Sequence, residues 1–223
     1  MISRPTDSSL APRLALHLGI AAVSSAAILI RQAQQEVPSL AVAAWRLALA
    51  SLVLLPWAAW RYRDEWRQLE PAAWGWALAS GAFLAAHFAS WITSLAYTSV
   101  ASSVVMVSTS PLWVALAARL FLGERLGRRT LVGLALAVAG GLVVALDDGG
   151  SGGPAPLLGN GLALVGALAV AGYWLIGRKL RRRLSLVPYA AMVYASAALP
   201  LLLLTRGAGL SLHGFSGRAW LWL

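Results

Sequence analysis

The stretch SLAVAAWRLALASLVLLPWAAW, residues 39–60, contains one charged side chain, that of Arg46. Because the hydrocarbon core of a membrane is about 30 Å thick, a helix needs about 20 apolar residues to cross it. The stretch meets this length, and it is bounded by Pro38 on one side and by Arg61 on the other. It therefore predicts a transmembrane helix.

Further apolar stretches of this kind fill most of the 223 residues. The predicted helices cover residues 14–30, 39–60, 72–94, 99–122, 130–146, 157–177 and 186–204, and another apolar run starts at 218–223. Apolar residues make up 59% of the chain and charged residues 12%, whereas soluble domains have about 45–50% and about 25%. We therefore predict an all-α membrane protein with about seven transmembrane helices and the start of an eighth.

The net charge of +10 is concentrated in alternate loops. If the N-terminus is cytoplasmic, the basic loops 61–70, 123–129 and 178–183 are cytoplasmic too, whereas the loops on the other side carry few basic residues. Membrane proteins keep an excess of Lys and Arg in their cytoplasmic loops. The asymmetry predicts a multi-pass protein with a cytoplasmic N-terminus, and the membrane that we expect is the bacterial inner membrane. The charge then reflects topology, and no nucleic acid is expected as a partner.

The chain contains an internal repeat. An apolar helix, a basic turn, a proline and another apolar helix occur both at its start and after its Gly- and Asp-rich linker, with Arg31 to Pro38 matching Arg178 to Pro188. Since the repeating unit has five helices, an odd number, its second copy must be inverted in the membrane, as in many secondary transporters. The expected domains are a disordered tail at 1–13, a first five-helix repeat at 14–146, the linker at 147–156 and an incomplete second repeat at 157–223.

Four groups of residues resemble a known family. They are Arg31 with Pro38 and Arg46, HFASWITSLAYTSVASS at 87–103, SPL at 110–112 with LFLGERL at 120–126, and GYWLIGR at 172–178. Together they resemble the EamA family of the drug/metabolite transporter superfamily. The resemblance implies ten helices in two inverted five-helix repeats, of which this chain would be the front part. It also implies a secondary transporter that exports a small metabolite or an amino-acid-like solute.

Polar residues inside the predicted helices indicate where a solute would bind. Spacings of four, three and four residues place one set on a single helix face: His87, Trp91, Ser94 and Thr98. The next helix has a similar face of serines. Two such faces favour a lined cavity, although serine and threonine also mediate close helix packing. The candidate substrate-binding residues are Arg46, His87, Trp91, Ser94, Tyr97, Thr98, Ser102, Ser103, Ser110, Tyr173 and Trp174.

Arg46 is the costliest residue to place in a membrane, at about 2.5–3.5 kcal/mol. At a rise of 1.5 Å per residue it would lie about 10 Å below the outer surface, near the depth of His87. Arg46 either binds an anionic group of a solute or binds backbone carbonyls as a structural clamp. His87 is either a site residue or a packed, hydrogen-bonded histidine. Pro111 should interrupt the helix at 99–122, as a gate hinge or as a static kink.

The sequence argues against several other functions. The patterns His-Glu-x-x-His and Gly-x-Ser-x-Gly and an intramembrane Asp pair are absent, so no enzyme is expected. The chain has no Cys, and its carboxylates fall in the tail and loops, so neither a metal nor a cofactor is expected. A retinal-type receptor needs a buried Lys, but Lys179, the only lysine, lies in a basic turn.

The expected partners are a small-molecule solute and membrane lipids, and a homodimer is left open. The alternative function is that of a membrane scaffold or structural protein without transport activity of its own.

Overall fold

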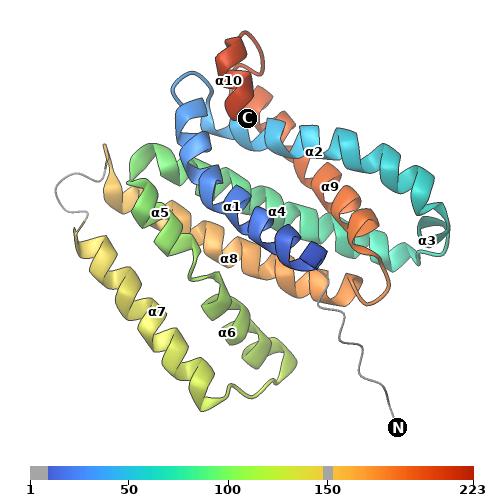
Figure 1. Ribbon diagram of the computed structural model, residues 1–223, viewed down its shortest axis with the longest axis horizontal. Helices are drawn as coiled ribbons and strands as arrows, with labels where there is room; N and C mark the ends of the chain where they lie inside the picture. Colours follow the sequence, from blue (N-terminus) through green and yellow to red (C-terminus); the bar gives the residue numbers. More distant parts are fainter. Residues whose placement is uncertain (1–9, 148–152) are drawn as a thin grey trace.

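The computed structural model describes residues 10–147 and 153–223. Within these ranges every secondary-structure element is a helix, and no strand is present (Figure 1). Six of the helices are long and apolar enough to cross a membrane. The prediction of an all-α membrane protein is therefore confirmed. Most of the predicted tail at 1–13 and half of the predicted linker at 147–156 lie outside the described residues.

The helices are α1 (Leu10–Ala33), α2 (Ser39–Arg61), α3 (Arg63–Arg67), α4 (Pro71–Tyr97), α5 (Val100–Val107), α6 (Ser110–Leu122), α7 (Arg128–Asp147), α8 (Pro156–Leu180), α9 (Leu186–Gly207) and α10 (Gly217–Trp222). Each of the seven predicted helices has its counterpart, and α10 lies where the eighth was expected to begin. The six candidate spans do not include α7. Because α1 begins at Leu10, the last four residues of the predicted tail are helical.

Local chemistry explains where α4 begins and where α5 begins after it. Pro71 lies in the first turn of α4, where its missing N–H would have no helical partner in any case. The helix ends at Tyr97, three residues later than predicted. Ser99 then caps α5, because its hydroxyl accepts a hydrogen bond from the N–H of Ser102 at 3.0 Å.

The predicted helix at 99–122 is two helices, α5 and α6, separated at Ser108 and Thr109. Pro111 lies in the first turn of α6 and not inside a continuous helix. Three hydroxyls donate to carbonyls of the preceding turn: Ser108 to Val104 and Thr109 to Met106, both at 2.7 Å, and Ser110 to Val107. The carbonyls of Val104 and Met106 still accept backbone N–H bonds, from Ser108 and Thr109. Pro111 has no N–H to offer the carbonyl of Val107, four residues earlier, so the Ser110 hydroxyl replaces that donor.

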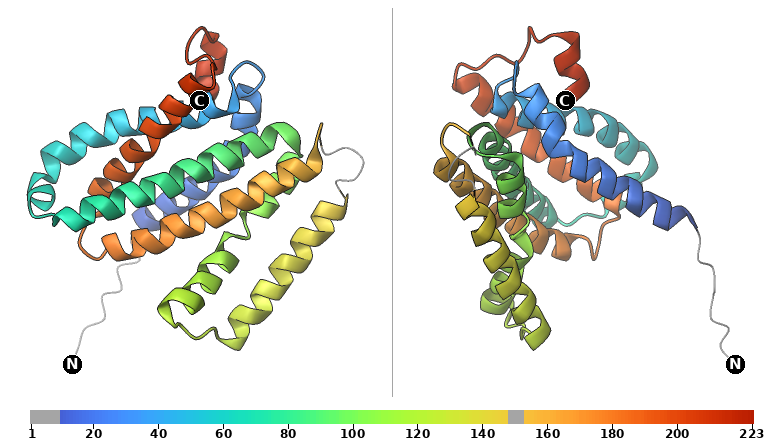
Figure 2. Two further views of the ribbon diagram at one scale, coloured as in Figure 1. Left: turned by 180° about the vertical axis from the view of Figure 1, so that it is seen from behind. Right: turned by 60° about the vertical axis from the view of Figure 1, so that its left-hand side comes forward.

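The centre of the molecule is α4, which packs along α8 and against α9, while α2 packs along α9 (Figures 1 and 2). Glycines allow α4 and α8 to approach closely. A Cβ added to Gly159 would lie 2.6 Å from the Thr98 Cβ, and one added to Gly166 would lie 3.1 Å from the Trp91 Cβ. Such contacts are typical of transmembrane helix packing. The helices α6 and α7 extend from one side of this core (Figure 2).

The packing pairs helices of the first predicted repeat with helices of the second. The second helices of the two repeats, α2 and α9, pack together. The third helix of the first repeat, α4, packs on the first of the second, α8, and α1 and α10 form the reciprocal pair. This exchange is what a two-fold axis in the membrane plane would generate. The number of repeats and the total of ten helices stay predictions.

Ion pairs bring the basic loops to one end of the molecule. Arg178, at the end of α8, lies 2.6 Å from a carboxylate oxygen of Glu124, which follows α6. Arg183 lies 2.6 Å from a carboxylate oxygen of Glu70, which precedes α4. The loops that follow α2, α6 and α8 are therefore neighbours, which places the chain's most basic segments together.

Carboxylates cap helices at both ends of the molecule. Glu65 accepts hydrogen bonds from the N–H and the hydroxyl of Ser185, at 2.8 and 2.6 Å, at the start of α9. Glu36, at the opposite end, does the same for Ser216 at the start of α10, at 3.2 and 3.0 Å. In each case a connecting segment of the first predicted repeat holds the first turn of a helix in the second.

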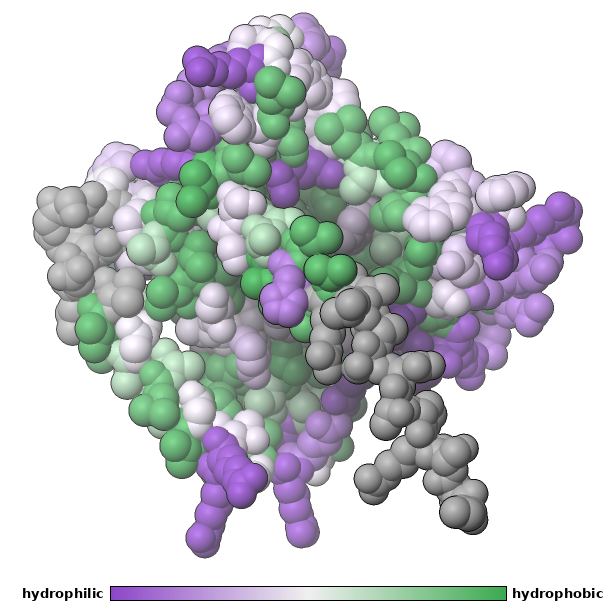
Figure 3. All heavy atoms as spheres, in the orientation of Figure 1, coloured by the Kyte–Doolittle hydropathy of each residue, from purple (hydrophilic) through white to green (hydrophobic). Residues whose placement is uncertain are grey.

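The outer surface is largely apolar. In Figure 3 apolar side chains cover much of the visible face, and the most hydrophilic residues gather at its edges. Large side chains such as Leu52, Trp60 and Phe121 are 66%, 80% and 83% exposed. Soluble monomers rarely expose apolar patches of more than a few hundred Å². This surface therefore suits contact with lipid chains.

Candidate functional site

Arg46 lies in the first half of α2 and is partly buried. One guanidinium nitrogen, Nη1, donates to the backbone carbonyl of Leu223 at 3.1 Å. The Nε donor is buried and has no partner among the described residues. The adjacent Trp45 donates to the carbonyl of Leu212 at 2.9 Å and meets Trp220 edge to face, with ring centroids 5.0 Å apart. The guanidinium therefore lies where α2 packs against the end of the chain, and its Nε donor stays unused.

His87 and Trp91 lie on the side of α4 that faces α8. The Nδ1 of His87 donates to the carbonyl of Gly166 at 2.9 Å. The rings of His87 and Trp91 stack, with centroids 5.6 Å apart and planes at 14°. The Nε1 donor of Trp91 is buried and has no partner among the described residues. The histidine thus links two helices, and the tryptophan keeps an unused donor.

The hydroxyl groups at the end of α4 form a network with α5 and α8. Ser94 donates to the carbonyl of Trp91 at 2.6 Å, and the Ser103 hydroxyl lies 2.6 Å from that of Ser94. Thr98 donates to the side-chain oxygen of Asn160 at 2.9 Å. The Ser102 hydroxyl is buried without a partner among the described residues. We call Ser94, Thr98, Ser102, Ser103 and Asn160 the hydroxyl network.

Asn160 was missed by the sequence analysis. It is the only asparagine in the chain, and it lies in an otherwise apolar stretch. A lone amide inside a transmembrane helix usually has a partner on a neighbouring helix. The position of Asn160 could therefore have indicated a polar contact between helices. Gln34, in the turn after α1, was also missed. Its amide nitrogen donates to the Ser39 hydroxyl at 2.9 Å and to the Ile92 carbonyl at 2.7 Å.

The other candidate residues lie outside the hydroxyl network. Tyr97 is partly buried at the end of α4, and its carbonyl accepts a hydrogen bond from the N–H of Ala155 at 3.2 Å. Tyr173 stacks on Tyr189, with ring centroids 6.0 Å apart. At 1.5 Å per residue, Tyr173 lies about 26 Å from the start of α8. Trp174 is 45% exposed.

The structure therefore separates Tyr173 and Trp174 from Arg46, because they lie toward opposite ends of the molecule. Ser110 is also apart from the network, since its hydroxyl bonds to the carbonyl of Val107 in its own helix break. The candidates that the structure brings together are the residues of the second half of α4 and the start of α5.

Comparison with known proteins gives two matches. The profile of the EamA-like transporter family matches residues 13–146. A protein of Rhizobium johnstonii named riboflavin transporter is 30% identical over 113 residues. That match covers 48% of this chain and 34% of the relative's length.

Proposed function

This chain belongs to the EamA-like transporter family, and from this premise we propose that it exports a small metabolite or an amino-acid-like solute. The coupling would be secondary, because the sequence has no phosphate-binding loop for ATP. Export would proceed across the bacterial inner membrane with the N-terminus in the cytoplasm. The clustering of the basic loops at one end supports this orientation.

Unpaired buried donors carry the proposal for the site. The Nε of Arg46, the Nε1 of Trp91 and the hydroxyl of Ser102 have no partner among the described residues, and they would lie in the outer half if the N-terminus is cytoplasmic. A buried polar group without a partner costs about 1–3 kcal/mol. A solute rich in acceptors, such as a carboxylate, would satisfy such donors. A guanidinium can also clasp a carboxylate through two parallel hydrogen bonds.

Alternating access gives the other candidate residues a role. If one repeat rocks against the other, a solute that enters from the cytoplasm would pass along α4 and α8 before it reaches the outer half. His87 and the hydroxyl network lie in this contact, and Tyr173 lies further along it. Pro111, at the start of α6, is proposed as the hinge of this motion.

A flat heteroaromatic solute is the second candidate. The relative's name raises riboflavin as a solute to test. The stacked rings of His87 and Trp91 favour it, because aromatic rings stack on flat heterocycles. Riboflavin has no carboxylate, so Arg46 would matter less to its transport.

The test is solute flux in vesicles that contain the purified protein. We expect time-dependent flux of a labelled amino acid, and Arg46→Lys should lower it about 10–100-fold, because lysine keeps the charge and loses the planar fork. Riboflavin flux is measured beside it. The matched control is Arg206→Lys, at the end of α9, which should leave flux unchanged.

Two outcomes would contradict the proposal. Absence of flux for every solute tested would favour the scaffold alternative. Loss of folded protein in Arg46→Lys, with normal flux per folded molecule, would make Arg46 a structural clamp.

A further inference from the structure

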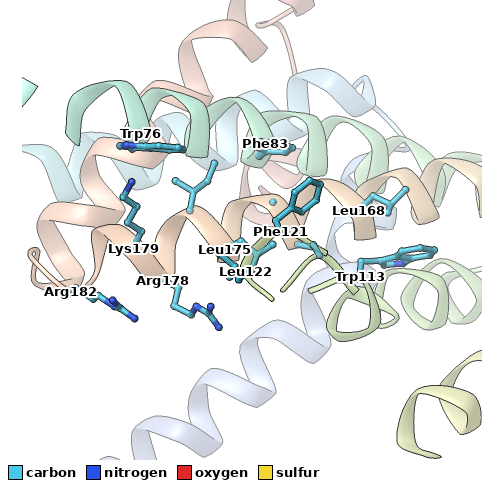
Figure 4. Close-up of a pocket in the computed structure, with 14 residues that line it drawn as sticks. Trp76, Phe83, Trp113, Phe121, Leu122, Leu168, Leu175, Arg178, Lys179 and Arg182 are labelled. Atoms are coloured by element: carbon cyan, nitrogen blue, oxygen red, sulfur yellow. The ribbon is translucent and has the colours of Figure 1, made fainter. Parts of the chain in front are cut away.

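A groove of about 780 Å³ lies between α4, α6 and α8, away from the hydroxyl network. Figure 4 shows its basic residues at one end and Trp113 and Leu168 at the other. We call it the α4–α6–α8 groove. Its apolar body is lined mostly by aromatic and leucine side chains, among them Phe83, Trp113, Phe121, Leu168 and Leu175, whereas Trp76 lies at the basic end.

The depth of the groove matches one leaflet of a bilayer. From Leu168 to Lys179 the α8 backbone rises about 17 Å, and half of the hydrocarbon core is about 15 Å. The groove therefore runs from the membrane surface to about the bilayer centre. Its apolar body would be filled by hydrocarbon, since water gains few hydrogen bonds there.

The basic end of the groove carries unbalanced positive charge. Arg178 is paired with Glu124 at 2.6 Å, which fastens the end of α6 to α8 and closes one wall. The Nζ of Lys179 lies 4.1 Å from the centroid of the Trp76 ring. Neither Lys179 nor Arg182 makes an ion pair with any residue in 10–147 or 153–223. Two cations thus remain available at the mouth.

We propose that the α4–α6–α8 groove binds an anionic phospholipid, with one acyl chain along α8 and the phosphate between Lys179 and Arg182. Basic pockets between transmembrane helices on the cytoplasmic side bind lipid phosphates. Trp76, which lies beside Lys179, suits the headgroup level, where an indole meets both water and hydrocarbon. Because Glu124 pairs with Arg178, Lys179 and Arg182 are the cations that meet the phosphate. The site does not depend on the transported solute.

The first test measures lipid binding to the purified protein by native mass spectrometry. Phosphatidylglycerol and phosphatidylcholine with identical acyl chains are added in turn. We expect phosphatidylglycerol to bind at least fivefold more tightly. The double variant Lys179→Gln with Arg182→Gln should weaken phosphatidylglycerol binding about 30-fold. Each cation near the membrane surface contributes about 1 kcal/mol, which is about a factor of five in the dissociation constant, and the two factors multiply.

The matched control is Arg181→Gln with Arg183→Gln, which removes the same charge from the same turn outside the groove. Arg181 donates to the carbonyl of Leu184, and Arg183 pairs with Glu70. This control should keep phosphatidylglycerol binding within twofold. If it weakens binding as much as the first variant does, the loop attracts anions without a site, and the proposal is overturned.

The second test separates the lipid from its headgroup. Ala117→Trp places a large side chain in the apolar body without changing the charge, and it should weaken phosphatidylglycerol binding about tenfold. Free glycerol phosphate in excess should not displace the lipid. Unchanged binding in Ala117→Trp, displacement by glycerol phosphate, or equal binding of phosphatidylcholine would each overturn the proposal.

Discussion

At the scale of single residues, small side chains decide how the central helices fit. A Cβ on Gly159 would lie 2.8 Å from the backbone nitrogen of Thr98, closer than real Cβ atoms approach. Gly161, two residues further along the same helix, is exposed and has nothing within 4 Å of its added Cβ. Composition alone treats the two glycines as equal, but only one of them lies at the contact with α4.

Gly159→Leu should therefore destabilise the protein, and Gly161→Leu should not. Overpacking costs about 1–3 kcal/mol when neighbours can move, and here the neighbour is backbone, so we expect the upper part of this range. The measurement is thermal unfolding in detergent. A midpoint for Gly159→Leu equal to that for Gly161→Leu would show that α4 and α8 do not pack as described.

The helical elements show how hydroxyls stabilise an interruption. Between α5 and α6 the side chains of Ser108, Thr109 and Ser110 donate to carbonyls of the preceding turn. In contrast, α9 continues through Pro200 without interruption. A proline alone therefore does not explain the break, at which three consecutive hydroxyls bond to carbonyls of the preceding turn.

Pro111→Ala tests whether the interruption works as a hinge. Alanine restores an N–H that can bond within a continuous helix, so a hinge should stiffen and flux should fall several-fold. The matched control is Pro200→Ala, which should leave flux unchanged. Folding of both variants is followed by size-exclusion chromatography. Normal flux in Pro111→Ala would identify the interruption as a static kink.

For the whole molecule, reciprocal pairing of the two predicted repeats sets the arrangement. The pairs α4 with α8 and α1 with α10 exchange first and third helices, and α2 pairs with α9. The caps follow the same exchange, because Glu65 holds the start of α9 and Glu36 the start of α10. Loops at the two ends of the molecule should then face opposite sides of the membrane.

Single cysteines test this topology, and the chain has no native cysteine to interfere. We expect Arg125→Cys, after α6, to react with an impermeant thiol reagent only from the cytoplasmic side, and Ser211→Cys, after α9, only from outside. Both positions are exposed. Reaction of both cysteines from the same side would refute the proposed orientation.

The sequence by itself determined the fold class and the positions of the long helices. A bilayer imposes a length of about 20 apolar residues on each span, and charge or proline ends it. These are local constraints, so they can be read along the chain, and the seven predicted helices all have counterparts. The family could also be recognised, because its residues occur in short groups such as 87–103.

Only the tertiary structure decided which polar groups meet. The partners of Thr98 and of Glu65 lie on other helices, 62 and 120 residues away, and no local pattern specifies such pairs. Tyr173 and Arg46 seemed suited to one site by residue type, but the helix rise places them toward opposite ends. The groove likewise needs three helices that are distant in sequence. Helix packing fixes these relations, because it sets which faces touch and at what depth.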